Sequence, residues 1–249
     1  MRNVTTYDAL ASDYDSLRFG KHWGRYDFEE TRAVIQDIVS TQLAACPSSY
    51  WSALDLACGT AKIAVTLGQL GGNVVALDLS PNMLQQCSAR SKEAGVEGKV
   101  RFTIGSAEAI PYRTGSFDCA FSFRFFHLLP AEAYPGVLRE MVRVVKPGGY
   151  IVLETKNRWY GGVMFWIKDF LRRKKGWTMF SSYMDPKKMR LLADEVEGVS
   201  LESIGGLLLP KGWLVMKYPR LRKLARVAAR KHMRFIAAQL VAIYRKDAQ

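Results

Sequence analysis

The 249-residue sequence has few of the side chains that bind metals or form disulfide frameworks. It contains three histidines and four cysteines, and the cysteines lie far apart with no C-x-x-C pair. This spacing indicates neither a zinc site nor a disulfide framework, so we expect no metal ion at the functional site. Free cysteines also favour a reducing compartment, and we expect the chain to be cytoplasmic.

The sequence also shows no pattern typical of a secretory leader or of a membrane-spanning run. The first fifteen residues are polar and acidic, with no basic stretch leading into an apolar one, so we expect no secretory signal. The apolar stretch at residues 161–171 is interrupted by Lys168 and Asp169 and is too short to cross a bilayer. With 49% hydrophobic residues, a chain of this length can bury one large core, and we expect one domain.

The second half of the chain has far fewer acidic than basic residues, and this imbalance gives the whole chain its net charge of +13. Residues 1–124 contain 12 basic and 13 acidic side chains, whereas residues 125–249 contain 24 basic and 10 acidic ones. Residues 210–234 hold nine basic residues and no acid. Such a segment could touch an anionic membrane surface, bind nucleic-acid phosphates, or be a solvated helix face. No nucleic-acid-binding module accompanies it, so nucleic acid is the less favoured partner.

The clearest functional pattern lies in the neutral half. Residues 51–57 form an apolar run with one acid, a turn-prone Cys-Gly-Thr follows, and helical spacing then returns. Residues 73–79 read as the next buried strand, with Asp78 near its end, nineteen residues after Gly59. An acid at about this distance is where an open α/β fold hydrogen-bonds a ribose. The pattern therefore predicts a nucleoside site.

Two glycines of a dinucleotide site are absent from this turn. A G-x-G-x-x-G turn lets the backbone wrap a pyrophosphate, whereas residues 57–61 read Ala-Cys-Gly-Thr-Ala. The sequence therefore disfavours NAD and FAD, and a dinucleotide oxidoreductase with them. It favours a ligand that has a ribose but no phosphates and whose amino acid end lies near Asp55.

Further motifs follow this turn in a fixed order. They are Ala-Leu-Asp-Leu-Ser at 76–80 with Asn-Met-Leu at 82–84, Gly-Ser-Ala-Glu at 105–108, Ser-Phe-Asp at 116–118 and Val-Lys-Pro-Gly-Gly-Tyr at 145–150. With Asp-Leu-Ala-Cys-Gly-Thr at 55–60, the set resembles the class I S-adenosylmethionine-dependent methyltransferases, in particular the small-molecule enzymes of ubiquinone and menaquinone biosynthesis. The resemblance implies an α/β fold: a Rossmann-like, seven-stranded, mostly parallel sheet with helices on both faces and an antiparallel last strand.

The resemblance also implies how one domain over residues 1–249 is organised. A helical lid would occupy 1–48, the cofactor-binding core 51–155, and substrate-cap insertions 156–184 and 210–234. The residues implied to bind S-adenosylmethionine are Tyr14, Asp55, Ala57, Cys58, Gly59, Asp78, Leu79, Met83, Ser106, Ala107, Glu108 and Phe123. Two positions depart from the family pattern: Ala61 replaces a frequent third glycine and is expected to tighten the first helical turn, and Ser106 replaces a common aspartate of the adenine loop.

Periodicity and turn signals place the remaining elements. They predict helices over 7–45, 81–94 and 131–145 and from 185 onward, and strands over 100–105, 117–123, 150–155, 199–208 and 237–244. The long stretch between 155 and 185 mixes aromatic with basic residues. Because long loops in compact domains are usually functional, we expect this one to cap an apolar or aromatic acceptor, which could be anionic. Part of it could equally be an ordinary core helix with Met164, Phe165, Ile167 and Phe170 on its buried face.

Methyl transfer from a sulfonium depends mainly on aligning donor and acceptor, so no catalytic triad is expected. We expect a small hydrophobic or aromatic acceptor and favour O-methylation over C-methylation. A hydroxyl acceptor is helped by a base, for which His127 after the fourth strand is the candidate, although its ring could equally be core packing. Two alternatives stay open: methylation of RNA or a peptide, which the absence of an N-P-P-Y-like tetrapeptide disfavours, and a nucleoside-binding subunit without catalysis.

Overall fold

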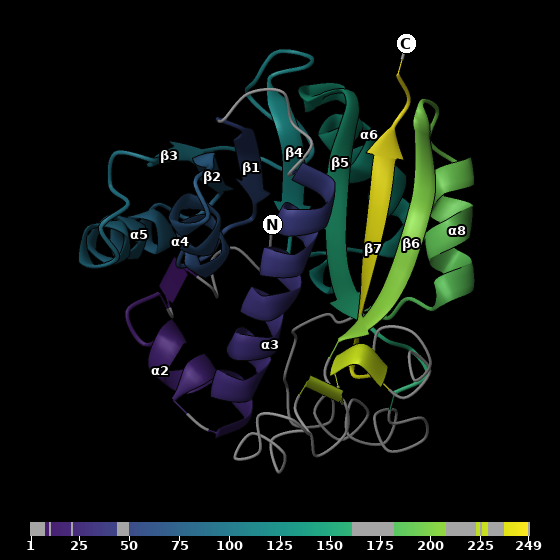
Figure 1. The fold of residues 1–249 in the computed structure, drawn as a ribbon. Helices are drawn as coiled ribbons and strands as arrows, with labels where there is room; N and C mark the ends of the chain where they lie inside the picture. Colours follow the sequence, from purple (N-terminus) through teal and green to yellow (C-terminus); the bar gives the residue numbers. More distant parts are fainter. Residues whose placement is uncertain are drawn as a thin grey trace.

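The computed structural model describes residues 8–9, 11–20, 22–43, 50–160, 182–207, 223–224, 226–228 and 237–248. Their strands form one seven-stranded sheet in the order β3-β2-β1-β4-β5-β7-β6 (Figure 1). The strands are β1 (Ser52–Leu56), β2 (Asn73–Asp78), β3 (Val100–Ile104), β4 (Phe117–Ser122), β5 (Val145–Lys156), β6 (Val199–Leu207) and β7 (Gln239–Lys246). Pairing is parallel from β3 through β5, and β7 runs antiparallel to both β5 and β6. The predicted sheet is confirmed.

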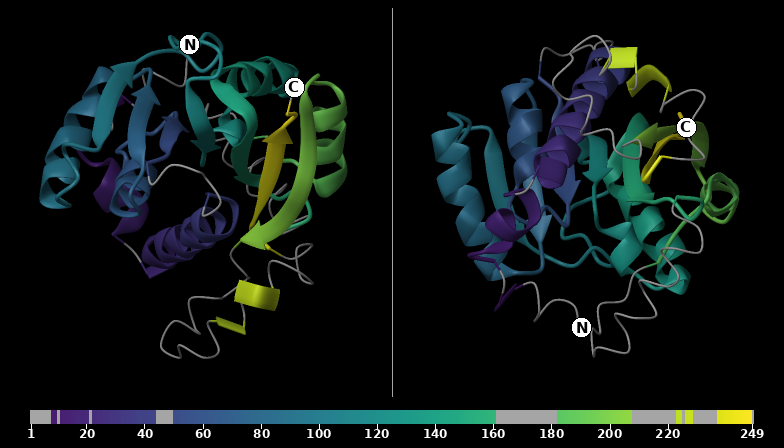
Figure 2. Two further views of the ribbon diagram at one scale, coloured as in Figure 1. Left: turned by 45° about the horizontal axis from the view of Figure 1, so that its top comes forward. Right: turned by 90° about the horizontal axis from the view of Figure 1, so that it is seen from below.

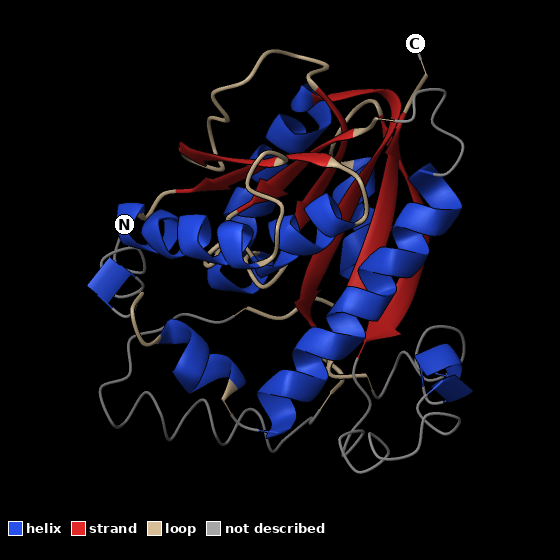
Figure 3. Cartoon of the chain, turned by 60° about the vertical axis from the view of Figure 1, so that its left-hand side comes forward, coloured by secondary structure: helices blue, strands red, loops and turns tan. Residues whose placement is uncertain are grey.

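Helices cover both faces of this sheet (Figures 2 and 3). They are α2 (Tyr14–Phe19), α3 (His22–Ile38), α4 (Lys62–Gln69), α5 (Pro81–Glu93), α6 (Tyr134–Val144) and α8 (Pro186–Asp194), with a π-helical turn at Val39–Leu43 and 3₁₀ turns at Phe126–Leu128 and Ala131–Ala133. Residues of α3, α4 and α5 pack in one buried cluster, and residues of α6 and α8 pack in the other.

Successive side chains of each strand point to opposite faces of the sheet, and this alternation produces the two clusters. In β1, Leu54 and Leu56 belong to the cluster of α6 and α8, whereas Ala53 belongs to that of α3 and α4, and all three are fully buried. A parallel strand covered on both faces has no solvent side. This explains why β1 reads as a continuous apolar run rather than as an alternating one.

Side-chain caps set the predicted starts of two helices. The Ser80 hydroxyl accepts a hydrogen bond from Met83 N at 3.1 Å, directly before Pro81. The Asp185 carboxylate likewise accepts one from Lys188 N at 2.9 Å, before Pro186. Each cap satisfies an amide that the helix leaves unpaired, and proline loses nothing at the first position. Both helices therefore begin where the sequence indicated.

Four predicted segments differ from the structure or lie partly outside the described residues. The strand expected at 150–155 begins earlier, because Val145 already pairs with Phe117 across a register shift. The predicted cap at 156–184 lies largely outside the described residues, as does most of 210–234 and part of the predicted lid at 1–48. Within the described residues, no helix is both long and apolar enough to cross a membrane.

Tyr244 links the antiparallel strand β7 to helix α8. Its side chain is fully buried, and its hydroxyl donates to the Met189 carbonyl at 3.0 Å. We expect Tyr244→Phe to lower the free energy of unfolding by about 1–2 kcal/mol, because a buried carbonyl loses its donor. Urea unfolding measures this loss. The half-buried Tyr150→Phe serves as the control, and an equal loss in both variants would contradict the assignment to this hydrogen bond.

Candidate active site

A cavity of about 730 Å³ opens at the carboxyl ends of β1 to β4. Its volume lies in the range of small-molecule sites, and its position is where open α/β sheets bind ligands. Most residues that the sequence assigned to the site line it: Tyr14, Ala57, Cys58, Gly59, Asp78, Leu79, Met83, Ser106, Ala107, Glu108 and Phe123. Asp55 and His127 are not among the lining residues.

The turn after β1 is held in a left-handed backbone conformation. Gly59 has φ +53°, and a Cβ built there would meet nothing within 4 Å, so this residue leaves open space beside the backbone. Ala57 and Ala61 also have positive φ, at +56° and +57°. For a residue with a Cβ, this conformation costs roughly 1–2 kcal/mol. The expectation that Ala61 only tightens the helix was therefore wrong: it precedes α4 in a conformation that suits the glycine it replaces.

Asp78 connects the end of β2 to this turn. One carboxylate oxygen accepts from Gly59 N at 2.8 Å, and the other accepts from Ser80 N at 2.9 Å. Burial raises the pKa of Asp78, while these amide hydrogen bonds oppose the rise. Each carboxylate oxygen can accept a further hydrogen bond. Asp78 therefore fixes the turn and can still accept hydrogen bonds from a ligand in the cavity, as a ribose requires.

Asp55 lies beneath the cavity instead of in its wall. Its side chain is 1% exposed, and Oδ2 accepts from Ala64 N in the first turn of α4 at 2.9 Å. Burial raises the pKa of Asp55 to about 8; the Ala64 amide acts against the rise, and the charge of Asp78 adds to it. A carboxyl at a helix N-terminus satisfies an unpaired amide. The structure thus gives Asp55 a supporting position under the turn, not the expected contact with a ligand.

The loop after β3 lines the cavity on the same side as Asp78. The Ser106 hydroxyl accepts from Glu108 N at 3.2 Å, and Ser106 forms an isolated bridge with Ala109. The serine that replaces the usual aspartate therefore helps to shape its own loop. Its hydroxyl hydrogen stays available as a donor. Leu79 and Met83 contribute apolar walls beside this loop.

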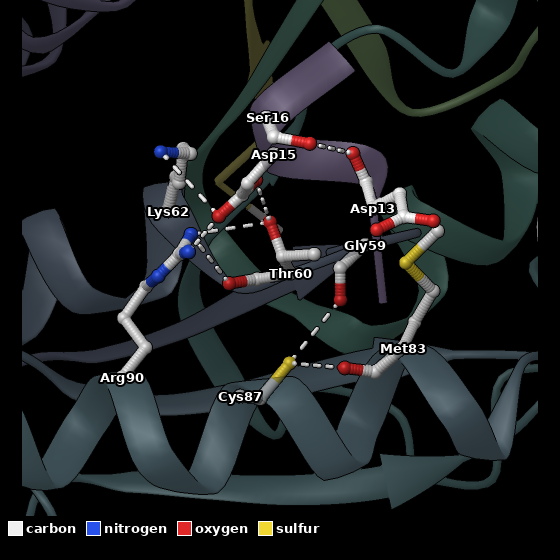
Figure 4. Close-up of polar contacts among 9 residues, drawn as sticks. All are labelled: Asp13, Asp15, Ser16, Gly59, Thr60, Lys62, Met83, Cys87 and Arg90. Atoms are coloured by element: carbon white, nitrogen blue, oxygen red, sulfur yellow. Dashed lines mark hydrogen bonds and ion pairs between the residues drawn. The ribbon is translucent and has the colours of Figure 1, made fainter. Parts of the chain in front are cut away.

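Asp15 links helix α2 to the turn after β1 (Figure 4). The Asp15 carboxylate accepts from the Thr60 hydroxyl at 2.9 Å, and it pairs with Arg90 of α5 and, at 3.7 Å, with Lys62 of α4. Thr60 lies between Gly59 and Ala61, so the contact reaches the motif itself. Tyr14, the neighbour of Asp15, lines the cavity. The lid expected over residues 1–48 stays a prediction, to which α2 adds a residue of the cavity lining.

Comparison with known proteins agrees with this geometry. Residues 54–153 match a family model described as a methyltransferase domain. Over these residues, which are less than half of the chain, the sequence is similar to methyltransferase domains. The matched range runs from β1 into β5 and includes Gly59, Asp78 and the loop after β3.

Individual relatives match larger or smaller parts of the chain around residues 54–153. A demethylmenaquinone methyltransferase from Lactococcus lactis is 32% identical over 155 residues, which are 61% of this chain and 57% of the relative's length. A ubiquinone biosynthesis O-methyltransferase from Xanthomonas axonopodis is 25% identical over 74% of this chain and 73% of its own. The solved structure of an S-adenosylmethionine-dependent methyltransferase from Methanosarcina mazei shares the fold, with TM-score 0.62 and 18% identity over 83% of this chain and 97% of that one.

Two polar groups near the cavity are poorly suited to proton transfer. His127 is 8% exposed in a 3₁₀ turn whose neighbours Phe125 and Leu128 line the cavity while His127 does not. A base must reach the proton it removes, so this position does not support the sequence-based choice of His127. Cys58 does line the cavity, but a hydrogen bond with Cys87, together with burial, raises the pKa of its thiol well above the ordinary value.

The other end of the cavity is aromatic and cationic. Phe19 and Phe28 line it, and Lys62 Nζ lies 4.2 Å and 4.9 Å from their ring centroids. The guanidinium carbon of Arg124 lies 4.7 Å from the Phe19 centroid. Sequence reasoning did not assign Phe19, Phe28 or Lys62 to the site. Their spacing looks like ordinary helix packing, and only the folding of α2 and α3 over β1 and β4 brings them together.

The Asp15 contact predicts a role for α2 in cofactor retention. We expect Asp15→Asn to speed the dissociation of S-adenosylhomocysteine by about three- to tenfold, since losing partly exposed ion pairs costs roughly 1 kcal/mol. Stopped-flow fluorescence measures the rate. The control is Asp13→Asn, which changes an exposed aspartate at the start of the same helix. Equal dissociation rates in both variants and the unchanged protein would show that α2 does not retain the cofactor through Asp15.

Proposed function

We propose that this protein is an enzyme that transfers the methyl group of S-adenosylmethionine to a small hydrophobic or aromatic acceptor. The observation that carries the proposal is the Asp78 carboxylate, which bonds the Gly59 amide at the edge of a cavity with aromatic walls. The match of residues 54–153 to a methyltransferase domain supports the same reading.

The residues of the cavity suit the nucleoside part of the donor. Asp78 would accept from the ribose hydroxyls, Leu79 and Met83 would flank the adenine, and the Ser106 loop would meet its edge. When bound, S-adenosylmethionine supplies a methyl group on a sulfonium, which is already electrophilic. The protein then has to orient the acceptor and keep water out, and such orientation can supply several kcal/mol, up to roughly 7–11 in favourable cases.

The acceptor class follows from the aromatic end of the cavity. Phe19, Phe28, Phe123 and Phe125 offer apolar surface suited to a ring or an isoprenoid-like chain. Two relatives carry names from menaquinone and ubiquinone biosynthesis, which supports a quinone-like phenol as acceptor. Among the transfers this allows, we favour methylation of oxygen over carbon, since the relative aligned over the larger part of this chain is an O-methyltransferase.

A membrane-bound acceptor would also give the basic segment at 210–234 a role. In its described part, Leu224 is 66% and Val227 47% exposed, and the neighbouring Lys223 is exposed as well. Exposed apolar residues beside cations suit the surface of an anionic membrane. Sedimentation with vesicles that contain anionic lipid tests this contact, and no binding at low salt would contradict it.

The activity test uses labelled donor and defined acceptors. The full chain is incubated with methyl-labelled S-adenosylmethionine and either a short-chain reduced demethylmenaquinone or a short-chain phenolic quinone precursor. We expect label in the phenolic product, with NMR placing the methyl group on oxygen. Label on a ring carbon would overturn the preference for oxygen. Tight binding of S-adenosylhomocysteine without transfer to either acceptor or to a cell extract would favour a non-catalytic nucleoside-binding protein.

A further inference from the structure

Lys62 is placed to meet the acceptor. It is the first residue of α4, directly after the turn that contains Gly59, and it lines the cavity. Its side chain is 21% exposed, and its Nζ lies over the rings of Phe19 and Phe28. A desolvated ammonium group in such a site interacts strongly with any anion that enters.

The charge of Lys62 is less well compensated than that of its neighbour Arg124. Arg124 donates to the Asp27 carboxylate at 2.7 Å, a full hydrogen-bonded ion pair. Among the described residues, the acidic partner of Lys62 is Asp15 at 3.7 Å, beyond normal hydrogen-bond length, and Asp15 also binds Thr60 and Arg90. Burial lowers the pKa of Lys62, and the nearby charge of Arg124 lowers it further. An additional anion would therefore be stabilised here.

The order of the strands separates this charge from the nucleoside end. In the sequence β3-β2-β1-β4, Asp78 ends β2 and Glu108 follows β3, so both acids lie on one side of the cavity. Lys62 follows β1 and Arg124 follows β4, on the other side, together with Phe123 and Phe125. The cavity thus pairs an acidic end, suited to ribose hydroxyls, with a cationic and aromatic end.

The geometry points to Lys62 as the residue that recognises an anionic oxygen on the acceptor, either a phenolate or a carboxylate. This inference rests on the proposed function and narrows its acceptor class. A nearby positive charge favours the ionised form of an acidic hydroxyl, so the phenol would lose its proton to solvent on binding. The oxygen's electron pair then forms the bond to the methyl carbon while the carbon–sulfur bond breaks, and sulfur keeps that electron pair. No protein base is required, which fits the position of His127 outside the cavity lining.

A carboxylate also ends the methionine part of the donor, and that group is the rival partner for Lys62. The aromatic rings around Nζ favour the acceptor, because Phe19 and Phe28 offer nothing to a zwitterionic amino acid end. Comparing S-adenosylhomocysteine with 5′-methylthioadenosine, which lacks that carboxylate, separates the two partners.

The test measures binding of two matched probes by calorimetry. 2-Naphthoate carries a carboxylate, and 2-naphthamide has nearly the same shape without the charge. In the unchanged protein, with and without saturating S-adenosylhomocysteine, we expect naphthoate to bind at least about tenfold tighter than the amide, a difference of roughly 1.4 kcal/mol. Lys62→Met should reduce this preference to less than about twofold, and Lys62→Arg should restore most of it. The control Lys92→Met, on the exposed side of α5, should keep it.

Several results would overturn the inference. In the unchanged protein, they are equal binding of the two probes or no binding of 2-naphthoate. In Lys62→Met, it is a preference for 2-naphthoate that survives the substitution. A loss of S-adenosylhomocysteine affinity of about tenfold or more in Lys62→Met, with 5′-methylthioadenosine unaffected, would assign the lysine to the donor carboxylate instead. If the unchanged protein does not bind S-adenosylhomocysteine, the proposed function is wrong. The comparison of 2-naphthoate with 2-naphthamide in the absence of S-adenosylhomocysteine still decides the role of Lys62.

Discussion

Asp78→Ala should weaken the binding of S-adenosylhomocysteine by at least about tenfold, and by up to a thousandfold if both ribose hydroxyls depend on it. Each hydrogen bond to a charged group contributes about 1.5–3 kcal/mol, and every 1.4 kcal/mol is a factor of ten in affinity. The substitution also removes the acceptors of the Gly59 and Ser80 amides, so the turn itself loosens. Both effects act in the same direction.

Calorimetric titration of S-adenosylhomocysteine measures the change, and Asp118→Ala is the matched control. Asp118 lies at the opposite end of the sheet, where it accepts from Ser52 N at 2.8 Å and pairs with Lys146 at 2.7 Å. This control should lower stability and leave affinity within about twofold, because it lies away from the cavity lining. If a folded Asp78→Ala protein binds as tightly as the unchanged one, the ribose assignment is wrong.

The fold and the nucleoside end of the site could be predicted because they depend on local patterns. Apolar runs mark the buried strands, and Ser80 and Asp185 mark the helix starts by capping. The carboxyl ends of neighbouring parallel strands meet at one edge, so the spacing between Gly59 and Asp78 already places them together.

The rest of the site depends on tertiary packing that local patterns do not encode. Asp55 shares a motif with Gly59, but it points to the face of β1 that α4 covers and so ends up under the helix. His127 follows a strand end as expected, yet the short turn Phe126–Leu128 carries it out of the cavity wall. Lys62 was not assigned to the site, because nothing in the sequence shows that Phe19 and Phe28 fold over it.

Asp55 should make the stability of the protein fall as the pH rises. Its folded-state pKa is about 8, against 3.8 for an unperturbed aspartate, so the folded protein holds this proton more tightly than the unfolded chain does. The stabilisation is complete below about pH 4, is lost progressively toward pH 8, and changes little above that. Each pH unit in this window is worth at most about 1.4 kcal/mol.

Thermal melts of the unchanged protein and Asp55→Asn, from pH 5 to pH 8.5, test this. As the pH rises from 5 to 8.5, the melting temperature of the unchanged protein should fall by at least about 5 °C more than that of Asp55→Asn. One kcal/mol shifts the melting temperature of a domain of this size by roughly 2–4 °C. Asp118→Asn is the control, because the stability that Asp118 contributes should change with pH in the opposite direction. Although burial acts to raise it, the hydrogen bonds from Lys146 and Ser52 hold the pKa of Asp118 below its usual range, so its stabilisation is lost only in acid.

The competing force on Asp55 is the N-terminus of α4. The Ala64 amide donates to the carboxylate at 2.9 Å, and unpaired amides at a helix start favour a negative charge. If that attraction outweighs the cost of burial, Asp55 stays ionised at neutral pH and the two melting curves run parallel from pH 5 to pH 8.5. Parallel curves would mean that a charged Asp55 holds α4 in place. Diverging curves would mean that the turn around Gly59 rests on a neutral carboxyl whose proton is lost near pH 8.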